Sequence, residues 1–415
     1  MEKFENHQEL FKISVSTGKM QVWKGWTMKD KVICSYGQLG GKMQTSEYTA
    51  EPKNIGRSNE TTSVQQAILE LEAMYESQIS NKHYRVTVEE AVEFANSNRE
   101  PRKILDYKKG WQKMSPTLYT STKFNGSRAC VLEGQLYSKI GKPEDIKVDH
   151  LRAVVEELSG IAHFDSEVYA HGLSLQRIRS AWLKPVKTDK EIIKIAKDRA
   201  KGKKDSVKFI SPEQAIEYIG YNPNDDAPQL KFYIFDIPNT TGKPYEERIE
   251  DMKSFEAIIK ERKLDVYFNF EYPVLTHSHE ERMEKLPEVV ELGFEGFVHY
   301  EPEGIYEFGK RSNNAQKSKP RYDAEARVVK VTEAKNGTGT LHVVASDALD
   351  NAEFKCVMKV GRRDGKSYSK SYESMLELVG KWITFSYEEL SDKGVPTKPV
   401  GEIERECDDE GNPLN

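Results

Sequence analysis

Five short segments that carry charged residues at the ends of apolar runs occur in one order along the middle of the chain, and no other feature constrains its fold as strongly. They are KFNGSR at 123–128, FDSE ending at Glu167, YIFD ending at Asp236, EGF beginning at Glu295 and KSK at 317–319. Taken singly each is ordinary, because a lysine beside a glycine turn usually lies in a solvated loop and a KSK run on a solvated strand edge. Taken together they indicate one fold that brings distant charged residues to a common site.

The region around these segments alternates strands with helices. From Leu118 the strand-like runs are YTSTKF, RACVLEG and QLYSKI, followed by a helical pattern over residues 147–159 and the strand HFDSEVYA. LKFYIFDI and ELGFEGFVHY add further buried strands. This alternation predicts a mixed α/β central domain.

Residues 183–228 interrupt this pattern with a lysine-rich insertion of helical spacing. One interpretation is a solvated helical insertion, and the other is an arm that contacts phosphates and positions nucleic acid without reading its sequence. The residues themselves leave both open. The basic residues concerned are Lys184, Lys187, Lys190, Lys194, Lys197, Arg199, Lys201, Lys203 and Lys204.

The N-terminal residues 8–50 have the pattern of short antiparallel strands, because FKISVS and QVWKGW alternate and glycines punctuate them. From Ser63 the apolar residues recur at helical spacing, which predicts a helix that covers the sheet. Residues 86–113 are charged and partly helical, so we interpret them as a linker or domain edge with a boundary near 90.

The chain changes character again after Asp323. EARVVKVTE, TLHVVAS, EFKCVMKVG and WITFSYEEL are successive strand-like runs separated by glycine or charged turns. Several short strands in this spacing predict a small β-barrel of the OB type. The final ECDDEGNPLN is expected to be an acidic frayed tail.

Length and composition fit an α+β multidomain protein. A chain of 415 residues exceeds what one core normally organises, so we expect three domains at 1–90, 91–321 and 322–415. The net charge is only −5, so contacts with nucleic acid must come from local basic patches. The four cysteines lack C-x-x-C spacing, which argues against a zinc site and a disulfide framework. Without a secretory leader or a long apolar stretch, a cytoplasmic protein that avoids membranes is expected.

Lys123 is the candidate nucleophile. An amine attacks a phosphate only when it is unprotonated, so such a lysine must be desolvated or surrounded by other cations. Lys123 ends an apolar run, and Arg128, Lys317 and Lys319 are candidate cationic neighbours. Gly126 permits a tight turn that would let backbone and phosphate approach closely.

Glu167 and Glu295 are the candidate metal ligands, because nucleotidyl transfer needs carboxylates for a divalent cation as well as basic groups. Each candidate has a plainer interpretation. Glu167 could be a solvent-facing strand residue, Asp236 could cap the turn before Pro238, and Phe235 could be a core aromatic. The combination favours the functional interpretation.

The ordered set resembles the covalent nucleotidyltransferase superfamily, in which an ATP-grasp-like domain carries the lysine. The spacing over 112–405 and the OB-like tail resemble an ATP-dependent DNA ligase of the phage type. The resemblance implies ATP and Mg²⁺ as cofactors, with Mn²⁺ able to substitute, nicked duplex DNA as partner, and a monomer. The roles it implies are Lys123 as the residue that forms lysyl-AMP, Lys317 and Lys319 at the α-phosphate, Thr122 near the adenine, Arg128 at phosphate or nick, Glu167 at ribose or metal, Phe235 stacked on adenine, Glu295 at magnesium, and Arg311 at the nucleotide or 5′-phosphate.

Two residues depart from that resemblance. The family has aspartate where this chain has Asn125, and because RNA-joining relatives tolerate non-acidic residues there, the sugar of the substrate stays open. The family's C-terminal basic motif is matched in part by Arg405.

The N-terminal part resembles a WGR domain, which binds DNA ends or nicks, through YGQLGG at 36–41, the helix from Ser63 and NKHYR at 81–85. Tyr36 and Gln38 replace the name-giving tryptophan and arginine, so an aromatic stacking surface is kept and a charged phosphate contact is lost. Trp23 and Trp26 are better explained as core residues.

The expected function is therefore an ATP-dependent DNA ligase. The alternatives are an RNA ligase of the same superfamily, a catalytically inactive protein that binds nucleic-acid ends, and a guanylyl-transferring cap enzyme. NAD is not expected as donor, because relatives that use it resemble chains with a cysteine-rich zinc module.

Overall fold

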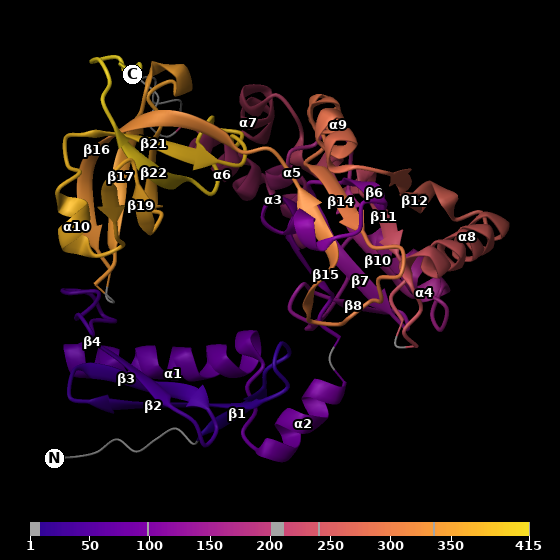
Figure 1. Cartoon of the computed structure of the whole chain (residues 1–415), viewed down its shortest axis with the longest axis horizontal. Helices are drawn as coiled ribbons and strands as arrows, with labels where there is room; N and C mark the ends of the chain where they lie inside the picture. The colour runs from indigo at the N-terminus through magenta and orange to yellow at the C-terminus, as the bar shows by residue number, and fades with distance from the viewer. Residues whose placement is uncertain (1–8, 98, 201–210, 240, 335–336, 415) are drawn as a thin grey trace. The chain divides into compact units, whose positions relative to one another are not determined.

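The computed structural model describes residues 9–97, 99–200, 211–239, 241–334 and 337–414 (Figure 1). The chain forms two compact units, of which residues 99–320 with 391–393 are one and the remaining residues the other. None of the helices in these ranges is long and apolar enough to cross a membrane. The predicted three-domain division stays a prediction.

The N-terminal segment is an antiparallel sheet covered by a helix. Its strands β1 (Leu10–Ile13), β2 (Met20–Met28), β3 (Lys31–Gln38) and β4 (Met43–Thr49) pair in chain order. Helix α1 (Ser63–Lys82) begins in a capping box formed by Thr62 and Gln65, and its Ala67 and Leu71 pack with the buried Trp23. Helix α2 (Val88–Asn96) lies against β1, so the boundary placed near 90 falls inside a helix.

Beyond residue 320, five of the described strands form the closed barrel that the sequence predicts. The order around the barrel is β16 (Tyr322–Glu333), β17 (Gly339–Ala345), β18 (Glu353–Met358), β22 (Val400–Arg405) and β21 (Trp382–Tyr387). Alternate residues of β17 point into the core. The smaller elements here are η5 (Asp347–Leu349), β19 (Gly361–Arg363), β20 (Lys366–Tyr368) and α10 (Tyr372–Leu376).

The frayed acidic tail is a wrong prediction for residues 406–414. Cys407 pairs with Pro413 in an isolated bridge, and the Asp408 side chain accepts a hydrogen bond from the Asn412 amide at 2.7 Å. A Cβ at Gly411 would lie 2.6 Å from the Trp382 ring, so the turn packs on β21. The local turn and the indole contact hold this acidic segment in place.

The central unit contains two sheets in its described residues. One has the order β12-β11-β10-β7-β8-β9, and the other β13-β6-β14-β15-β5. The strands are β5 (Lys103–Asp106), β6 (Leu118–Lys123), β7 (Ser127–Leu132), β8 (Gln135–Tyr137), β9 (Pro143–Glu144), β10 (Phe164–Tyr169), β11 (Lys231–Asp236), β12 (Phe268–Phe270), β13 (Val274–Thr276), β14 (Gly296–Tyr300) and β15 (Arg311–Ser318). Because β5 pairs with β15, part of the stretch interpreted as a linker is a strand of the second sheet.

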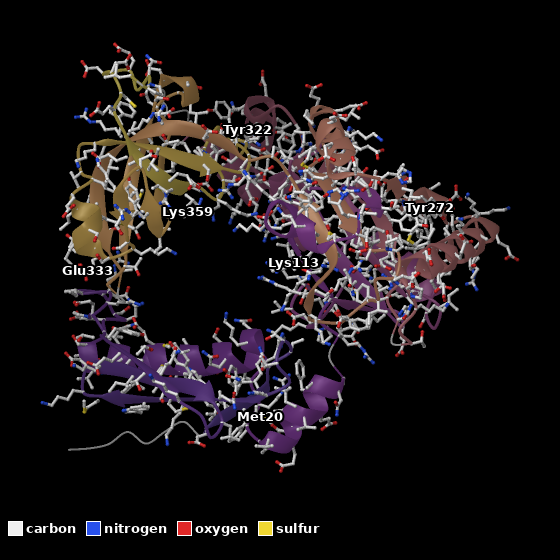
Figure 2. All side chains as sticks on the ribbon, viewed as in Figure 1. Met20, Lys113, Tyr272, Tyr322, Glu333 and Lys359 are labelled. Atoms are coloured by element: carbon white, nitrogen blue, oxygen red, sulfur yellow. The ribbon has the colours of Figure 1, made fainter. Side chains whose placement is uncertain are left out.

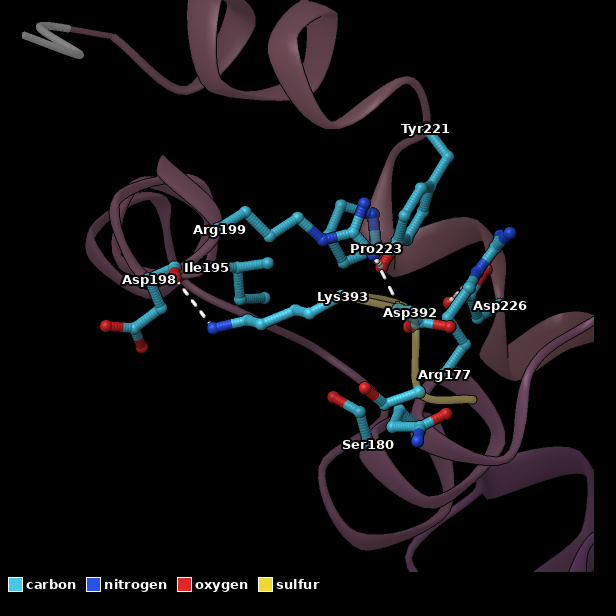
Figure 3. A pocket seen from close by; sticks show the side chains of 12 residues that line it. Arg177, Ser180, Ile195, Asp198, Arg199, Tyr221, Pro223, Asp226, Asp392 and Lys393 are labelled. Carbon is cyan, nitrogen blue, oxygen red and sulfur yellow. Dashed lines mark hydrogen bonds and ion pairs between the residues drawn. The ribbon is translucent and has the colours of Figure 1, made fainter. Parts of the chain in front are cut away.

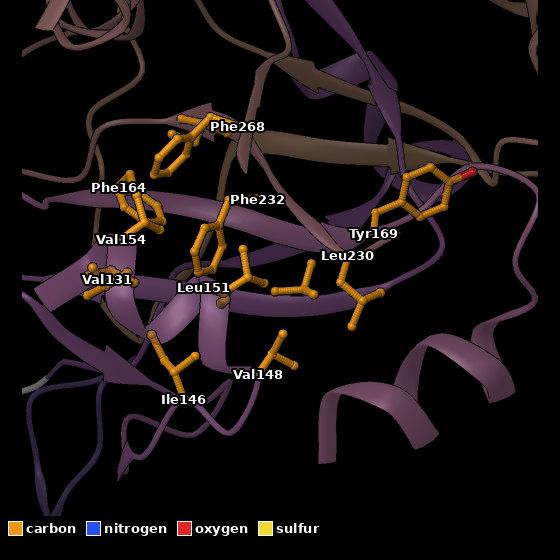
Figure 4. Close-up of a cluster of buried hydrophobic side chains, with 14 of the residues drawn as sticks. Val131, Ile146, Val148, Leu151, Val154, Phe164, Tyr169, Leu230, Phe232 and Phe268 are labelled. Carbon is orange, nitrogen blue, oxygen red and sulfur yellow. The ribbon is translucent and has the colours of Figure 1, made fainter. Parts of the chain in front are cut away.

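One face of the first sheet carries the largest hydrophobic core (Figure 4). Phe164, Phe232 and Val131 pack there against Leu151 and Val154 of α4 (Asp149–Glu157), the helix predicted over 147–159. Burying each such side chain contributes about 1.5–3 kcal/mol. This core leaves the opposite face of β7, β10 and β11 for polar residues. The remaining helices are α3 (Tyr107–Gly110), η1 (Trp111–Lys113), α5 (Leu175–Leu183), η2 (Pro223–Asp225), η3 (Ala227–Gln229), α8 (Tyr245–Glu261), η4 (Asp265–Tyr267) and α9 (His279–Glu291).

The lysine-rich insertion has a small core of its own. Helices α6 (Asp189–Ala200) and α7 (Pro212–Ile219) bury Ile192 and Ile219 against each other. Lys187 is buried and donates to the carbonyl oxygens of Ser180 and Lys184 at 3.1 and 2.5 Å, so this lysine is structural. Lys201, Lys203 and Lys204 lie outside the described residues.

Candidate active site

Lys123 and Glu295 meet where β6 ends and β14 begins. The amide of Glu295 donates to the carbonyl oxygen of Lys123 at 2.9 Å, and the Lys123 ammonium forms an ion pair with Oε2 of Glu295. Lys319 reaches the other oxygen, with Nζ 3.0 Å from Oε1. One carboxylate therefore holds two of the three predicted catalytic lysines.

Lys317 lies on the same face of the sheet. In the ladder, β14 pairs Gly296 with Lys123 and Val298 with Lys317. Residues two apart on a strand share a face, so Lys123, Lys317 and the following Lys319 project to one side. The two lysines of KSK therefore lie on the same face as Lys123, and their catalytic role stays a prediction.

Glu167 brings the first sheet into the same site. On β10 it lies between Arg128 of β7 and Tyr233 of β11. Burial raises the pKa of Glu167 to about 7, Lys123 and Arg128 act in the opposite direction, and Glu295 adds to the rise. These mutual effects place Glu167 within electrostatic reach of the Lys123–Glu295 pair, so the facing sheets contribute to one site.

The number of predicted metal ligands, two carboxylates, is one that Mg²⁺ accepts in a nucleotide site. Magnesium is typically held by one or two protein carboxylates, with substrate phosphates and waters completing its shell. Within the described residues there is no group of three or more His, Cys, Asp or Glu side chains that could hold a metal. Glu167 and Glu295 stay the predicted metal ligands, and a cation bound by them would favour the ionised form of Glu167.

Arg128 is engaged inside the protein. Its guanidinium donates to both oxygens of the buried Asp165, at 2.9 and 2.5 Å, and to the carbonyl oxygen of Arg102 at 2.7 Å. Tyr306 donates to the same carboxylate at 2.6 Å. These three hydrogen bonds within the protein fix the Arg128 side chain beside Glu167. A phosphate that bound Arg128 would have to share or displace these hydrogen bonds.

Asp236 is buried in an ion-pair network and does not cap a turn through an exposed side chain. Arg248 donates to it at 2.7 and 3.1 Å, and Arg102 at 2.5 Å. Although burial opposes ionisation, Arg248 and Arg102 hold the pKa of Asp236 below its usual value. The sequence analysis did not identify Asp165, Arg102 and Arg248 as members of this network. Of the three, only Asp165 lies within one of the motifs, two residues before Glu167 in FDSE.

The two glycines of the motifs allow close packing of strands. A Cβ on Gly126 would lie 2.4 Å from the carbonyl oxygen of Val168 and 2.8 Å from Cγ of Glu167. Gly296 has φ of +142°, and a Cβ there would lie 2.3 Å from the carbonyl oxygen of Ser318. The sequence suggested that Gly126 lets a phosphate approach the backbone closely. In the structure the group that approaches Gly126 closely is strand β10.

Thr122 and Phe235 lie on different elements beside the site. The Thr122 amide donates to Oε1 of Glu271 at 2.7 Å, while its side chain is on the face of β6 opposite to Lys123. Phe235 is half-buried near the end of β11, with the Arg128 guanidinium 5.8 Å from its ring centre. Glu271 is a further carboxylate at the site that sequence reasoning missed.

Three further predicted residues lie on other strands. Arg311 is exposed at the start of β15, six positions from Lys317, which corresponds to about 20 Å along a strand. Tyr36 is 39% exposed on β3 of the N-terminal sheet, where it pairs with Trp23. Arg405 pairs with Trp382 in the barrel. Their functional roles stay predictions.

A pocket of about 310 Å³ lies elsewhere in the central unit, beside the lysine-rich insertion (Figure 3). Its charged side chains have internal partners. Arg177 pairs with Asp226 at 2.5 Å, and Lys393 donates to the carbonyl oxygen of Asp198 at 2.7 Å. The side chains that carry the predicted chemistry are not among those that line it.

No protein-family model matches the chain, and no curated protein sequence matches it significantly. Solved structures do match. One from "DNA binding with a minimal scaffold: Structure-function analysis of Lig E DNA ligases" is 21% identical, covers 74% of this chain and 98% of its own, and has a TM-score of 0.52. The chain shares the fold of this ligase.

Two further structures are similar. "Pmar-Lig_Pre" is 16% identical, covers 83% of this chain and 77% of its own, and has a TM-score of 0.53. The Chlorella virus DNA ligase-adenylate is 22% identical over 75% of this chain and 99% of its own, with a TM-score of 0.37. At these identities the likeness concerns the fold, so activity has to be argued from the site.

Proposed function

We propose that this protein is an ATP-dependent DNA ligase that seals nicks in duplex DNA through a lysyl-AMP intermediate. The observation that carries the proposal is the Lys123–Glu295–Lys319 cluster facing Glu167. A lysine amine, two carboxylates and two further cations in one site are the groups that nucleotidyl transfer requires. The fold shared with a Lig E DNA ligase supports the same conclusion.

Three transfers follow from this assignment. The unprotonated Nζ of Lys123 attacks the α-phosphorus of ATP, which forms a P–N bond and releases pyrophosphate. An oxygen of the DNA 5′-phosphate then attacks the same phosphorus, and the P–N bond breaks. Finally the 3′-hydroxyl attacks the 5′-phosphate, loses its proton and releases AMP as the phosphodiester forms.

The surrounding side chains orient and neutralise these groups. Lys317 and Lys319 balance charge on the α-phosphate, and Phe235 stacks on the adenine. Glu167 and Glu295 would hold Mg²⁺, or Mn²⁺ in its place, and such a cation polarises the phosphate oxygens when bound. Glu295 orients Lys123 through their ion pair. Arg128 lies opposite Glu167 on the neighbouring strand, and its hydrogen bond to Asp165 fixes its own position there.

Other parts of the chain are assigned to the binding of nucleic acid. The N-terminal sheet offers the exposed Tyr36 for stacking in a WGR-like role, and the barrel would act as the OB-fold domain. Arg311 would contact the nucleotide or the 5′-phosphate only after a rearrangement. We assign the protein as a cytoplasmic monomer with three domains. Its role would be in DNA repair, replication or recombination, as for bacteriophage ligases.

The test is covalent labelling of the full chain. Purified protein is incubated with Mg²⁺ and α-labelled ATP or GTP, denatured and separated, and Lys123→Ala is compared with Lys139→Ala, an exposed lysine outside the site. We expect an acid-labile label from ATP that is lost only in Lys123→Ala. Intact mass identifies AMP that is already attached.

The outcomes separate the alternatives. A label from GTP would indicate a cap enzyme, and sealing of nicked RNA in preference to nicked DNA would favour an RNA ligase, consistent with Asn125. Neither label nor attached AMP would leave an end-binding protein as the better account.

A further inference from the structure

Three lysines lie along one face of helix α6 in the lysine-rich insertion. Lys190, Lys194 and Lys197 are spaced by four and three residues, which places them one above another on a helix. All three side chains are exposed. Ile192 and Ala196, about half a turn away, pack against α7, so the lysines project from the side of α6 opposite to its core. We call these three residues the α6 lysine face.

The absence of partners, and not exposure, distinguishes this face. Lys113 and Lys359, labelled in Figure 2, are exposed as well. On α8 and α9, however, Lys253, Lys260 and Lys285 each form an ion pair with a glutamate about one turn earlier. In the part of the chain that the structure describes, no lysine of the α6 lysine face forms an ion pair or a side-chain hydrogen bond.

The acidic residues close to these lysines in the chain are placed otherwise. Glu191 pairs with Lys184 at 2.5 Å, and it accepts hydrogen bonds of 3.0 Å from the amide and the hydroxyl of Thr188. Asp198 lines the pocket of Figure 3, on another side of the helix. Among the described residues, the positive charge of the α6 lysine face is therefore not neutralised by an ion pair.

This arrangement is unfavourable for the helix alone. Like charges three or four positions apart repel each other and destabilise a helix. The helix dipole favours a cation in the last turn, which suits Lys197, but it opposes a cation in the first turn, where Lys190 lies. An anion that bound across the α6 lysine face would remove both unfavourable contributions.

We propose that the α6 lysine face binds the phosphate backbone of duplex DNA, whether or not the duplex carries a nick. Lys190 and Lys197 are about 10 Å apart along the helix axis. This length corresponds to about three phosphate intervals, because one DNA strand carries a phosphate every 3.4 Å or so of the duplex axis. Ammonium groups contact phosphates as point charges and do not read bases.

The partner follows from charge complementarity. The chain has a net charge of −5, so a polyanion would be attracted by a local cluster such as this one and not by the protein as a whole. The inference rests on the proposed function only for the choice of DNA as the polyanion. It adds a contact that belongs to the insertion and uses none of the residues of the candidate active site.

The test measures binding of the full chain to two duplexes of one sequence, one nicked and one intact, in EDTA so that no chemistry occurs. The variant carries Lys190→Gln, Lys194→Gln and Lys197→Gln together, because glutamine keeps the helix propensity of lysine and removes its charge. Each lost phosphate contact lowers the slope of log affinity against log salt by about 1. We expect the slope to fall by about 3, and the affinity at low salt to fall at least tenfold, equally for both duplexes.

The matched control carries Lys253→Gln, Lys260→Gln and Lys285→Gln, which removes the same charge from lysines that are paired with glutamates. We expect the control to keep the wild-type slope, and thermal denaturation shows that both variants are folded. Equal losses in the two variants would attribute the effect to net charge and contradict the proposal. An unchanged slope in the α6 variant would identify a solvated helix face, and a loss confined to the nicked duplex would contradict backbone binding.

This proposal and the ligase assignment fail separately. Lysyl-AMP forms from ATP without DNA, so we expect the α6 variant to be labelled like the wild type. Protein that forms lysyl-AMP, and whose α6 variant binds DNA as the wild type does, contradicts the α6 lysine face alone. Protein that never forms lysyl-AMP, but whose α6 variant loses the salt dependence, contradicts the ligase assignment alone. Wild-type protein that does not bind duplex DNA contradicts both.

Discussion

Lys123 and Glu295 form an ion pair although 172 positions separate them in the chain. A backbone hydrogen bond of 2.9 Å between the same two residues joins β6 to the start of β14. Burial opposes ionisation of Glu295, and the Lys123 and Lys319 ammonium groups nevertheless hold the pKa of Glu295 below its usual value. The proposed nucleophile is thus held in an ion pair, and a cation that binds Glu295 would compete with Lys123 for the same oxygens.

The first prediction concerns this pair. Glu295→Gln leaves Lys123 and Lys319 without their shared anion in a largely buried place, so we expect a loss of about 1–3 kcal/mol in the free energy of unfolding. Lysyl-AMP formation should fall at least 100-fold, because a metal ligand is lost as well. Urea denaturation and covalent labelling of the full chain measure both effects. Glu284→Gln, an exposed change on α9, should alter neither; similar values for the two variants would contradict the prediction.

The second prediction concerns pH. Burial raises the pKa of Glu167 to about 7 from an ordinary value of 4.5. Below pH 4.5 the Glu167 carboxyl is protonated in both the folded and the unfolded chain, so it does not lower the free energy of unfolding. Between pH 4.5 and 7 the unfolded chain releases the proton first, so stability falls as pH rises, by about 3 kcal/mol in total.

Glu167→Gln removes this dependence and should be more stable than the wild type by about that amount at pH 8, but not at pH 4.5. Denaturation at pH 4.5, 6, 7 and 8 measures it. Adding Mg²⁺ at pH 8 should stabilise the wild type and have little effect on the variant. A stability difference that stays constant across this range would show that Glu167 titrates normally.

The third prediction concerns the buried network around Asp236. Asp236→Asn leaves the side chains of Arg102 and Arg248 charged, buried and without a counter-ion, so we expect a loss of about 3–5 kcal/mol. Asp251→Asn is the matched control, because Asp251 forms a partly exposed pair with Lys243 at 2.8 Å, for which at most about 1 kcal/mol is expected. Equal losses in the two variants would mean that burial does not decide the strength of these pairs.

Periodicity and motif order predicted much of the fold. The alternating runs after Leu118 and after Asp323 became the strands of the central sheets and of the closed barrel, because side chains that alternate along a strand must place apolar residues on a core face. The same period placed Lys317 and Lys319 together. The acidic tail was misjudged because its charge gave no sign of the contact between Gly411 and Trp382.

The sequence by itself determined which residues could perform the chemistry, since residue type and order are written in it: Lys123, Glu167, Glu295, Lys317 and Lys319. Only the tertiary structure decided their partners. Arg128 pairs with Asp165, and Asp236 forms ion pairs with Arg102 and Arg248. Glu271 accepts a hydrogen bond from Thr122, which lies 149 positions away in the chain. Such pairings depend on the register of the strands and on which charged side chains become buried, because a buried charge is stable only when it is paired. The local spacing of residues specifies neither of these.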